Sequence, residues 1–279
     1  MPPDATAPAA RGPLGRFRAL PHDSPARAFV VIIAVCVVCS VLVSAAAVVL
    51  APIQHENALR VRQRQILQAA GLLDPSRDVP PQFAQVIPRM VDLASGDYVE
   101  AGDPVDFDVG IASRAPGTSE PVAEEADIAR IRRRPDAMPV YLVERAGRVE
   151  TVVLPVHGYG LWSTLYGFLA LEGDGRTVKG ITFYRHGETP GLGGEIDNPA
   201  WQAKWVGKQA IAPDGAVLLE VVKGEPRGDA AVSQVDGLAG ATLTARGVSN
   251  LARYWLGEQG FGPYLARLRA TQGGPADEG

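Results

Sequence analysis

The chain has 279 residues, of which 46% are hydrophobic, so it can bury a sizeable core as one large domain or two small ones. Its formal net charge of −4 and the absence of any long basic run exclude the basic surface that proteins use to bind a phosphate backbone. We therefore expect no nucleic-acid partner.

Residues 28–51 form an apolar segment without a single charge. As a helix this segment would be about 36 Å long, which exceeds the roughly 30 Å of a bilayer core. The apolar part of a cleaved signal peptide is usually shorter, about 7 to 15 residues. We therefore predict a retained, single transmembrane helix at residues 28–53. The arginines on its two sides are almost balanced, so charge alone only leans toward a cytoplasmic N-terminus.

Both cysteines, Cys36 and Cys39, lie within this apolar segment. They are either a ligand pair that the helix contributes to a larger assembly or two small apolar residues in contact with lipid, and the second interpretation is favoured. The rest of the chain therefore has no disulfide, no thiolate metal site and no cysteine nucleophile.

Residues 1–27 are rich in Pro, Ala and Arg and are predicted to be a disordered tail. Residues 54–136, after the membrane helix, are expected to form a stalk and a region of helices and loops. Here the sequence predicts a polar stalk helix at 55–70 that stops at Gly71, a helix at 81–94 and a loop at 106–121. A third helix is predicted at 124–134, where acids precede bases as the helix dipole favours.

From residue 138 the pattern changes to β-strands. Strand-like runs on both sides of a turn at Gly147, and again on both sides of a turn at 173–175, predict two hairpins of an antiparallel sheet. A further strand is expected at 216–222 and an amphipathic helix at 244–256. The predicted fold class is α+β, with the folded domain at residues 137–270 and a disordered tail at 271–279.

The segment 235–244 reads VDGLAGATLT and concentrates small residues around Thr242. A hydroxyl that follows Gly240 and Ala241 at the start of a helix is uncrowded, and the first N–H groups of a helix form an anion site. The alternative is that Thr242 or Thr244 caps the helix, as threonines often do. Spacing alone favours the cap.

A second glycine-rich stretch, RHGETPGLGGEIDN at 185–198, directly follows a predicted strand. Glycines such as Gly191 and Gly193 let main-chain N–H groups approach a flat ring closely. Glu188 and Thr189 can form hydrogen bonds, and Leu192 can lie on an aromatic face. The stretch is therefore a candidate for binding a planar cofactor.

Together with GYGLWSTLYGF at 158–168 and NPAWQAKWVGK at 198–208, these stretches closely resemble the C-subunit family of the sodium-pumping NADH:quinone oxidoreductase. The resemblance runs from the membrane helix through GEQGFGPYLARLR at 257–269. VDGLAGATLT is similar to the flavinylation signal of these redox complexes, in which the threonine oxygen is esterified to the phosphate of FMN. The residues that match the signal are Asp236, Gly237, Gly240, Ala241 and Thr242. Ala239 stands where the family usually has Ser or Thr, and the resemblance leaves open whether this departure lowers the efficiency of attachment.

The resemblance implies a covalent FMN on Thr242 whose ring is cradled by the two glycine-containing stretches. The residues expected at the ring are Leu161, Trp162, Ser163, Thr164, Glu188, Thr189, Gly191, Leu192 and Gly193. Lys223 is expected to stabilise an anionic reduced flavin; a solvated surface lysine is an equal alternative. No side chain of this protein needs to act as a general acid or base.

The resemblance also implies that the chain relays single electrons between neighbouring subunits of a bacterial inner-membrane complex that oxidises NADH, reduces ubiquinone and exports sodium. NADH, quinone and Na⁺ would bind to partner subunits, because the chain has no dinucleotide fingerprint and only one membrane helix. A flavin transferase would attach the FMN outside the cytoplasm. The N-terminus would then be cytoplasmic and the folded domain periplasmic.

Three alternatives remain open at this point. The G subunit of the Rnf ferredoxin:NAD complex shares the threonine signal but lacks GLWSTLYGF. A metal hydrolase would use His157, His186 and Glu188, yet no helical His-Glu-x-x-His motif accompanies them; otherwise we expect His157 at a strand end and His186 beside the flavin. A membrane-anchored scaffold would hold no cofactor. It would use its tryptophans as core or interface anchors, and core is favoured for most of Trp162, Trp201, Trp205 and Trp255.

Overall fold

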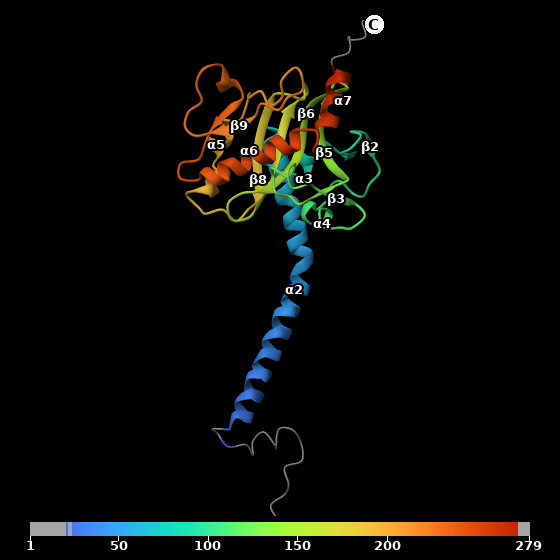
Figure 1. Cartoon of the computed structure of the whole chain (residues 1–279). Coiled ribbons are helices and arrows are strands. Elements are labelled where there is room, and N and C mark those ends of the chain that lie inside the picture. Colours follow the sequence, from blue (N-terminus) through green and yellow to red (C-terminus); the bar gives the residue numbers. More distant parts are fainter. Residues whose placement is uncertain (1–20, 22–23, 273–279) are drawn as a thin grey trace, which may run out of the picture. The chain divides into compact units, whose positions relative to one another are not determined.

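The computed structural model describes residue 21 and residues 24–272. The chain divides into two compact units, Met1–Asn57 and Ala58–Gly279 (Figure 1). The predicted tails at 1–27 and 271–279 lie largely outside the described residues. Residues 25–27 begin the first helix, and residues 271 and 272 belong to the last one.

Helix α2 (Pro25–Ala69) is continuous over 45 residues and contains both the predicted membrane span and the predicted stalk. Among the described residues it is the one helix long and apolar enough to cross a membrane, with a mean hydropathy of 3.0 over its most apolar window. Cys36 and Cys39 are exposed and free within it. The helix ends just before Gly71, whose φ of +69° is the left-handed conformation that terminates helices.

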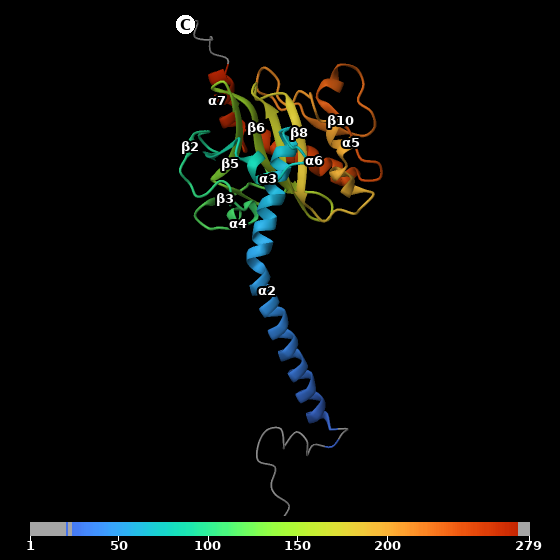
Figure 2. The same cartoon turned by 180° about the vertical axis from the view of Figure 1, so that it is seen from behind.

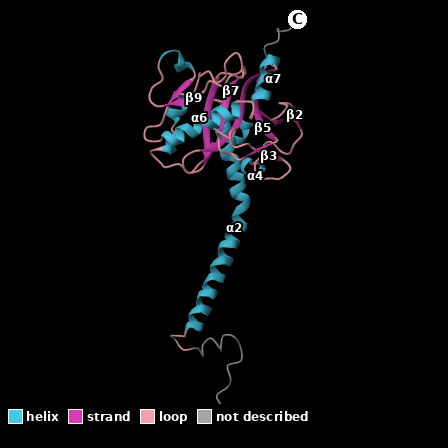
Figure 3. Ribbon diagram, viewed as in Figure 1, coloured by secondary structure: helices cyan, strands magenta, loops and turns pink. Residues whose placement is uncertain are grey.

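The second unit is built on a six-stranded sheet in the order β2-β1-β5-β6-β7-β8. Strands are drawn in magenta in Figure 3. Every neighbouring pair is antiparallel. The strands are β1 (Val86–Asp92), β2 (Tyr98–Val99), β5 (Ala137–Arg145), β6 (Arg148–Tyr159), β7 (Thr164–Glu172) and β8 (Val178–Arg185). The two predicted hairpins, β5–β6 with its turn at Gly147 and β7–β8 with its turn at Gly175, are confirmed.

Successive side chains of a strand point to opposite faces of the sheet, and here each face packs against a separate core. On β6, Leu154 belongs to a large core with α6 (Thr242–Leu256), whereas Val153 belongs to a smaller core with Ile66 and Leu67 from the end of α2. Figure 1 shows α6 across one face of the sheet, and Figure 2 shows α3 (Val79–Phe83) and the end of α2 on the other. This arrangement confirms the α+β class.

Shorter elements surround the sheet. A parallel pair, β9 (Glu220–Val222) and β10 (Gln234–Asp236), lies beside α6, and β3 (Ser119–Pro121) pairs with β4 (Arg133–Pro135). The remaining elements are the helices α4 (Val109–Ala112), α5 (Pro199–Ala203) and α7 (Gly262–Gln272) and the 3-10 helices η1 (Gly193–Asp197) and η2 (Gly228–Val232). Three of the four tryptophans are buried as expected, and only Trp162 is exposed.

The predicted helix at 81–94 is wrong over most of its length. Only the first residues are helical, in α3, and residues 86–92 form β1. All seven residues of β1 are in register with β5, and Pro88 lacks the N–H that a helix interior requires. Pairing with β5 within the sheet therefore overrides the local pattern.

The predicted helix at 124–134 is also wrong, and the segment forms turns followed by β4. The Asp127 carboxylate accepts hydrogen bonds of 2.8 Å from the N–H groups of Ile131 and Arg132, which pulls the backbone out of helical geometry. Arg130 and Arg132 accordingly have φ values of 54° and 65°. In addition, the predicted loop at 106–121 contains α4 and β3, and the predicted strand at 216–222 is shortened to β9.

Candidate functional site

The predicted attachment residue, Thr242, is the first residue of α6 and is exposed to solvent. Ala241 occupies the N-cap position, so α6 begins without a capping side chain, two residues earlier than predicted. The alternative, in which Thr242 or Thr244 caps the helix, is therefore wrong. Within the described part of the chain, no group accepts a hydrogen bond from the N–H of Thr242, Leu243 or Thr244. An exposed hydroxyl thus stands beside unpaired helix donors.

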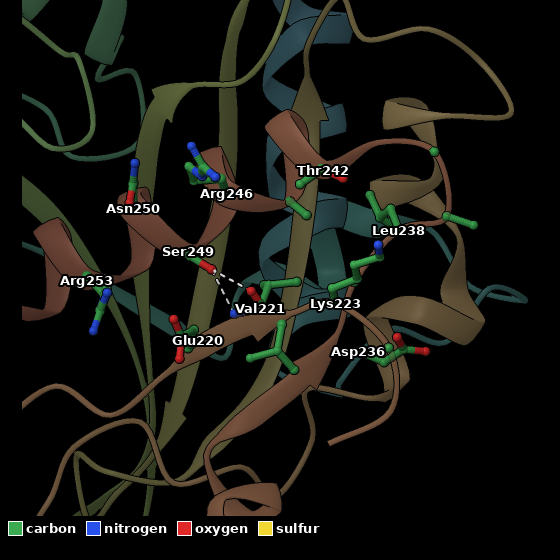
Figure 4. Close-up of a pocket in the computed structure, with 16 residues that line it drawn as sticks. Glu220, Val221, Lys223, Asp236, Leu238, Thr242, Arg246, Ser249, Asn250 and Arg253 are labelled. Atoms are coloured by element: carbon green, nitrogen blue, oxygen red, sulfur yellow. Dashed lines mark hydrogen bonds between the residues drawn. The ribbon is translucent and has the colours of Figure 1, made fainter. Parts of the chain in front are cut away.

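A cavity of about 770 Å³ lies beside Thr242, between α6 and the β9–β10 pair (Figure 4). It brings together the predicted residues Thr242, Asp236, Gly237, Gly240 and Lys223. The next turns of α6 add four polar residues that were not predicted, namely Arg246, Ser249, Asn250 and Arg253. Their helical spacing from Thr242 is the signal that would have found them.

The loop before α6 is fixed by close backbone contacts. Ser249 Oγ on α6 accepts a 2.7 Å hydrogen bond from Val221 N–H on β9 (Figure 4). Gly237 N–H donates to Val222 O at 2.7 Å, and a Cβ on Gly237 would lie 2.7 Å from the same oxygen, so only glycine fits. Gly240 has a φ of +73°, a conformation that glycine adopts without strain, and it turns the chain into the helix.

Asp236, the acid of the segment VDGLAGATLT, forms contacts within the protein. Its Oδ2 pairs with Lys204 Nζ at 2.7 Å, and its carbonyl oxygen accepts a 2.9 Å hydrogen bond from Trp201 Nε1. These contacts tie the loop before Thr242 to α5 and the residue that follows it. Lys204 was not predicted as a site residue, although it lies in the stretch 198–208 that carried the resemblance.

Glu188 is the centre of a second cluster, and its side chain is buried. Its Oε1 accepts hydrogen bonds from the N–H groups of Leu161 at 3.1 Å, Trp162 at 3.0 Å and Ser163 at 3.4 Å. Its Oε2 accepts a 2.6 Å hydrogen bond from the hydroxyl of Thr244. This one carboxylate therefore joins the β6–β7 turn to the first turn of α6.

Two opposing effects act on the pKa of Glu188. Burial on its own raises it, but the hydrogen bonds from Thr244 and from the N–H groups of 161–163 together outweigh burial and hold the pKa below its usual value. Glu188 is thus an ionised carboxylate whose oxygens serve the protein, whereas the sequence analysis expected it to bind a ligand.

The glycines around Glu188 leave no room for a side chain. A Cβ on Gly193 would lie 2.5 Å from Thr244 Oγ1 and 2.8 Å from Glu188 Oε2, and a Cβ on Gly160 would lie 2.6 Å from Glu188 Oε1. Gly191 has a φ of +75° in the same loop. The carbonyl of Thr189 accepts hydrogen bonds from Leu192 N–H at 3.1 Å and Gly194 N–H at 2.9 Å, which closes the glycine turn.

Exposed apolar side chains flank this cluster. Trp162 is 65% exposed, Leu243 52% and Leu192 45%, and Leu161 is also exposed. A Cβ on Gly240 would lie 3.0 Å from Leu192 Cδ2, which places Leu192 next to the loop that precedes Thr242. Thr164 is the exception among the predicted ring residues, because it begins β7 and lines a different cavity.

The two histidines of the metal-site alternative do not meet. His157 is buried in β6, whereas His186 Nε2 pairs with Asp197 Oδ2 at 2.8 Å and lines a cavity that does not include Thr242. No three His, Cys, Asp or Glu side chains of the described residues are grouped so that they could hold a metal ion. The geometry therefore gives no support to a metal hydrolase, and it places His186 away from the Thr242 cavity.

Comparison with known proteins identifies the family. The profile of the FMN-binding domain matches residues 160–257, the part of the chain that holds both clusters. The C subunit of the Na⁺-translocating NADH-quinone reductase of Pseudomonas aeruginosa is 49% identical over 254 residues, which cover 89% of this chain and 97% of that protein. The chain belongs to the C-subunit family of the Na⁺-translocating NADH-quinone reductase. It is thus a subunit of an oxidoreductase complex, as the resemblance implied.

Other members of this family agree. The C subunit of Neisseria meningitidis serogroup B is 46% identical over 251 residues, covering 89% of this chain and 96% of that protein. The crystal structure of NqrC from Shewanella oneidensis superposes with a TM-score of 0.69 at 36% identity, covering 75% of this chain and 96% of that one. The C subunit from Parabacteroides distasonis gives a TM-score of 0.60 at 27% identity, covering 76% and 95%. These relatives favour the C-subunit family over the Rnf family, and the FMN-binding domain speaks against a cofactor-free scaffold.

Proposed function

We propose that this chain carries FMN esterified to Thr242 and serves as an electron relay within the complex. The observation that carries the proposal is the exposed Thr242 hydroxyl at the uncapped start of α6. A phosphoester on this oxygen would bring acceptor oxygens to the unpaired N–H groups of the first turn, where the helix dipole also favours negative charge. The cavity residues Lys223 and Arg246 would add positive charge on the same side.

The flavin ring would be held against the exposed apolar side chains beside the Glu188 cluster. Leu161, Trp162 and Leu192 present apolar surface, and Gly191 and Gly193 allow close approach of the backbone. When bound, the isoalloxazine would supply the electron chemistry, and the protein would supply position and electrostatics. The partial exposure of these side chains would let the edge of a ring face a neighbouring subunit.

The other functions of the complex would belong to its partners. We assign NADH oxidation, ubiquinone reduction and sodium binding to partner subunits. Electrons would pass through this chain one at a time, during turnover coupled to sodium export. A separate flavin transferase would attach the FMN.

The relay is tested in the assembled complex. With Thr242→Ala in this chain, NADH-dependent quinone reduction is expected to fall at least about a hundredfold, because an electron carrier is missing. NADH oxidation by an artificial acceptor should persist. Thr242→Ser, which keeps a hydroxyl, is the matched control and should retain most quinone reduction. If the complex reduces quinone at an undiminished rate while its Thr242→Ala chain carries no FMN, the chain is not on the electron path.

We also propose that the N-terminus is in the cytoplasm and that the domain from residue 58 onward lies in the periplasm, with α2 as the single span of the inner membrane. Alkaline phosphatase folds actively only outside the cytoplasm, because it needs disulfides. Fused after residue 272, it should be active in intact cells, whereas fused ahead of α2 it should be inactive. The reverse pattern would invert the proposed topology.

A further inference from the structure

A second cavity, of about 1030 Å³, lies at the end of β6 and the start of β7. Its walls come from α4, the turns at 122–133 and the two strands, and it shares no lining residue with the cavity beside Thr242. Of the residues that the resemblance assigns to the flavin, only Thr164 lines this cavity. The cavity therefore requires its own explanation.

Two of its lining residues carry buried polar atoms without a partner. His157 is 4% exposed, and neither its Nδ1 nor the Oγ of Ser113 has a hydrogen-bond partner among the described residues. Buried polar groups are normally paired, because leaving one unpaired costs about 1 to 3 kcal/mol. Both residues line the cavity, and the two unpaired atoms lie just beneath its surface.

The charge around the cavity indicates which kind of ligand. Arg114, Arg130 and Arg132 line it and are exposed, and within the described residues none of the three forms an ion pair. Arg133 also lines it, but its guanidinium donates to Ser119 Oγ at 3.0 Å and to the Ser119 carbonyl. Three guanidinium groups thus remain available to an anion.

The acids of the cavity do not cancel these charges. Asp127 lines the cavity, but each of its carboxylate oxygens already accepts a backbone N–H, from Ile131 and Arg132, both at 2.8 Å. Glu124 is the other acidic residue of the lining. The Arg185 guanidinium lies 4.0 Å from the centre of the Tyr166 ring, which lines the cavity, and adds positive charge nearby.

His157 adds no charge to the cavity. Burial, and then the charge of Arg185, lower its pKa to about 3, so the imidazole is uncharged at neutral pH. In the tautomer that is protonated at Nδ1, this atom is an N–H donor with no acceptor in the protein. The exposed guanidinium groups of Arg114, Arg130 and Arg132 are therefore the donors that the cavity offers to an oxyanion, above an uncharged imidazole.

We propose that this cavity binds a phosphate-bearing anion, at a site separate from the Thr242 cavity. Its volume exceeds that of a bare phosphate, so the ligand is either a small soluble phosphate compound or the headgroup of an anionic phospholipid. The site adjoins the β6–β7 turn, since the Tyr159 hydroxyl at its wall donates a 3.3 Å hydrogen bond to the Trp162 carbonyl.

The test uses the full chain in a neutral detergent and calorimetric titration at fixed ionic strength. The probes are inorganic pyrophosphate and, separately, short-chain phosphatidylglycerol, with short-chain phosphatidylcholine as the uncharged lipid. Saturable binding of pyrophosphate or of phosphatidylglycerol is expected, and the tighter of the two identifies the source of the phosphate. Saturation by neither probe overturns the proposal.

Variants locate the binding. Arg114→Gln with Arg132→Gln is expected to weaken it at least about tenfold, since two charge-assisted contacts are lost. Arg148→Gln, an exposed arginine at the opposite end of β6, removes the same charge outside the cavity and should leave binding unchanged. Full-strength binding by the double variant, or an equal loss with Arg148→Gln, would show that the anion binds elsewhere.

Discussion

Replacing Thr242 with alanine is expected to abolish covalent attachment of FMN completely. The exposed Thr242 hydroxyl is the group that can be esterified at the start of α6. The hydroxyl of Thr244 is fully buried and donates a 2.6 Å hydrogen bond to Glu188, so an attaching enzyme cannot reach it. The measurement is ultraviolet fluorescence of the band on a denaturing gel, after expression with a flavin transferase, with the intact mass of the protein as a second readout.

Two variants serve as controls for this result. Thr242→Ser keeps an exposed hydroxyl and should retain the added FMN mass. Thr244→Ala should also retain it, although the protein will be less stable because Glu188 loses a donor. Mass analysis of the peptide that contains both residues works even for a poorly folded variant. The assignment to Thr242 would be refuted if the peptide of Thr242→Ala still carried the FMN mass. It would also be refuted if Thr244→Ala lost this mass and Thr242→Ala did not.

Replacing Glu188 with glutamine is expected to lower the free energy of unfolding by about 2 to 4 kcal/mol at neutral pH. The carboxylate accepts three backbone N–H groups and the hydroxyl of Thr244. The amide of glutamine offers one acceptor atom and turns an NH₂ toward donors that then stay unpaired. Thermal unfolding of the full chain in detergent measures the difference, and the exposed Glu172→Gln is the matched control.

The pH dependence of this effect has a defined sign. The pKa of Glu188 is lowered in the folded protein, so its contribution is present above the unfolded pKa of about 4.3 and is lost as pH falls through the folded value. The stability gap between wild type and Glu188→Gln should therefore narrow below about pH 4. Gly193→Ala, whose Cβ would crowd both Thr244 and Glu188, should destabilise the same cluster by steric means. Unchanged melting of Glu188→Gln at pH 7 would refute the role given to the carboxylate.

Local sequence patterns predicted the parts of the fold that are stabilised locally. The apolar part of α2, the two hairpins and α6 follow from an uncharged run, from turn glycines at 147 and 175, and from helical spacing of apolar residues. The helix predicted over β1 failed because pairing with a strand about fifty residues away in the sequence determines that segment. The helix predicted at 124–134 failed because one side chain, Asp127, binds two backbone N–H groups.

The candidate site was predictable in its residues but not in their roles. The glycine-rich stretch at 185–198 indicated Glu188 as a residue at a planar ligand, and the resemblance indicated Asp236 as part of the attachment signal. In the structure Glu188 holds two turns together, and Asp236 pairs with Lys204. Such contacts join segments that lie far apart in the chain, 56 positions for Thr244 and Glu188, and no spacing rule announces them.

The end of α2 has a practical consequence for anyone preparing a detergent-free version of this domain. Ile66, Leu67, Ala69 and Ala70 form part of the smaller core, and the carbonyl of Gln65 accepts a 3.0 Å hydrogen bond from Thr182. A chain that begins at Gly71, where α2 has ended, would lack these four core residues. Phe168 and Tyr141 of the same core would then be exposed to water. A chain that begins at Ala58 lacks the apolar part of α2 but keeps the residues of its last turns that pack in the smaller core.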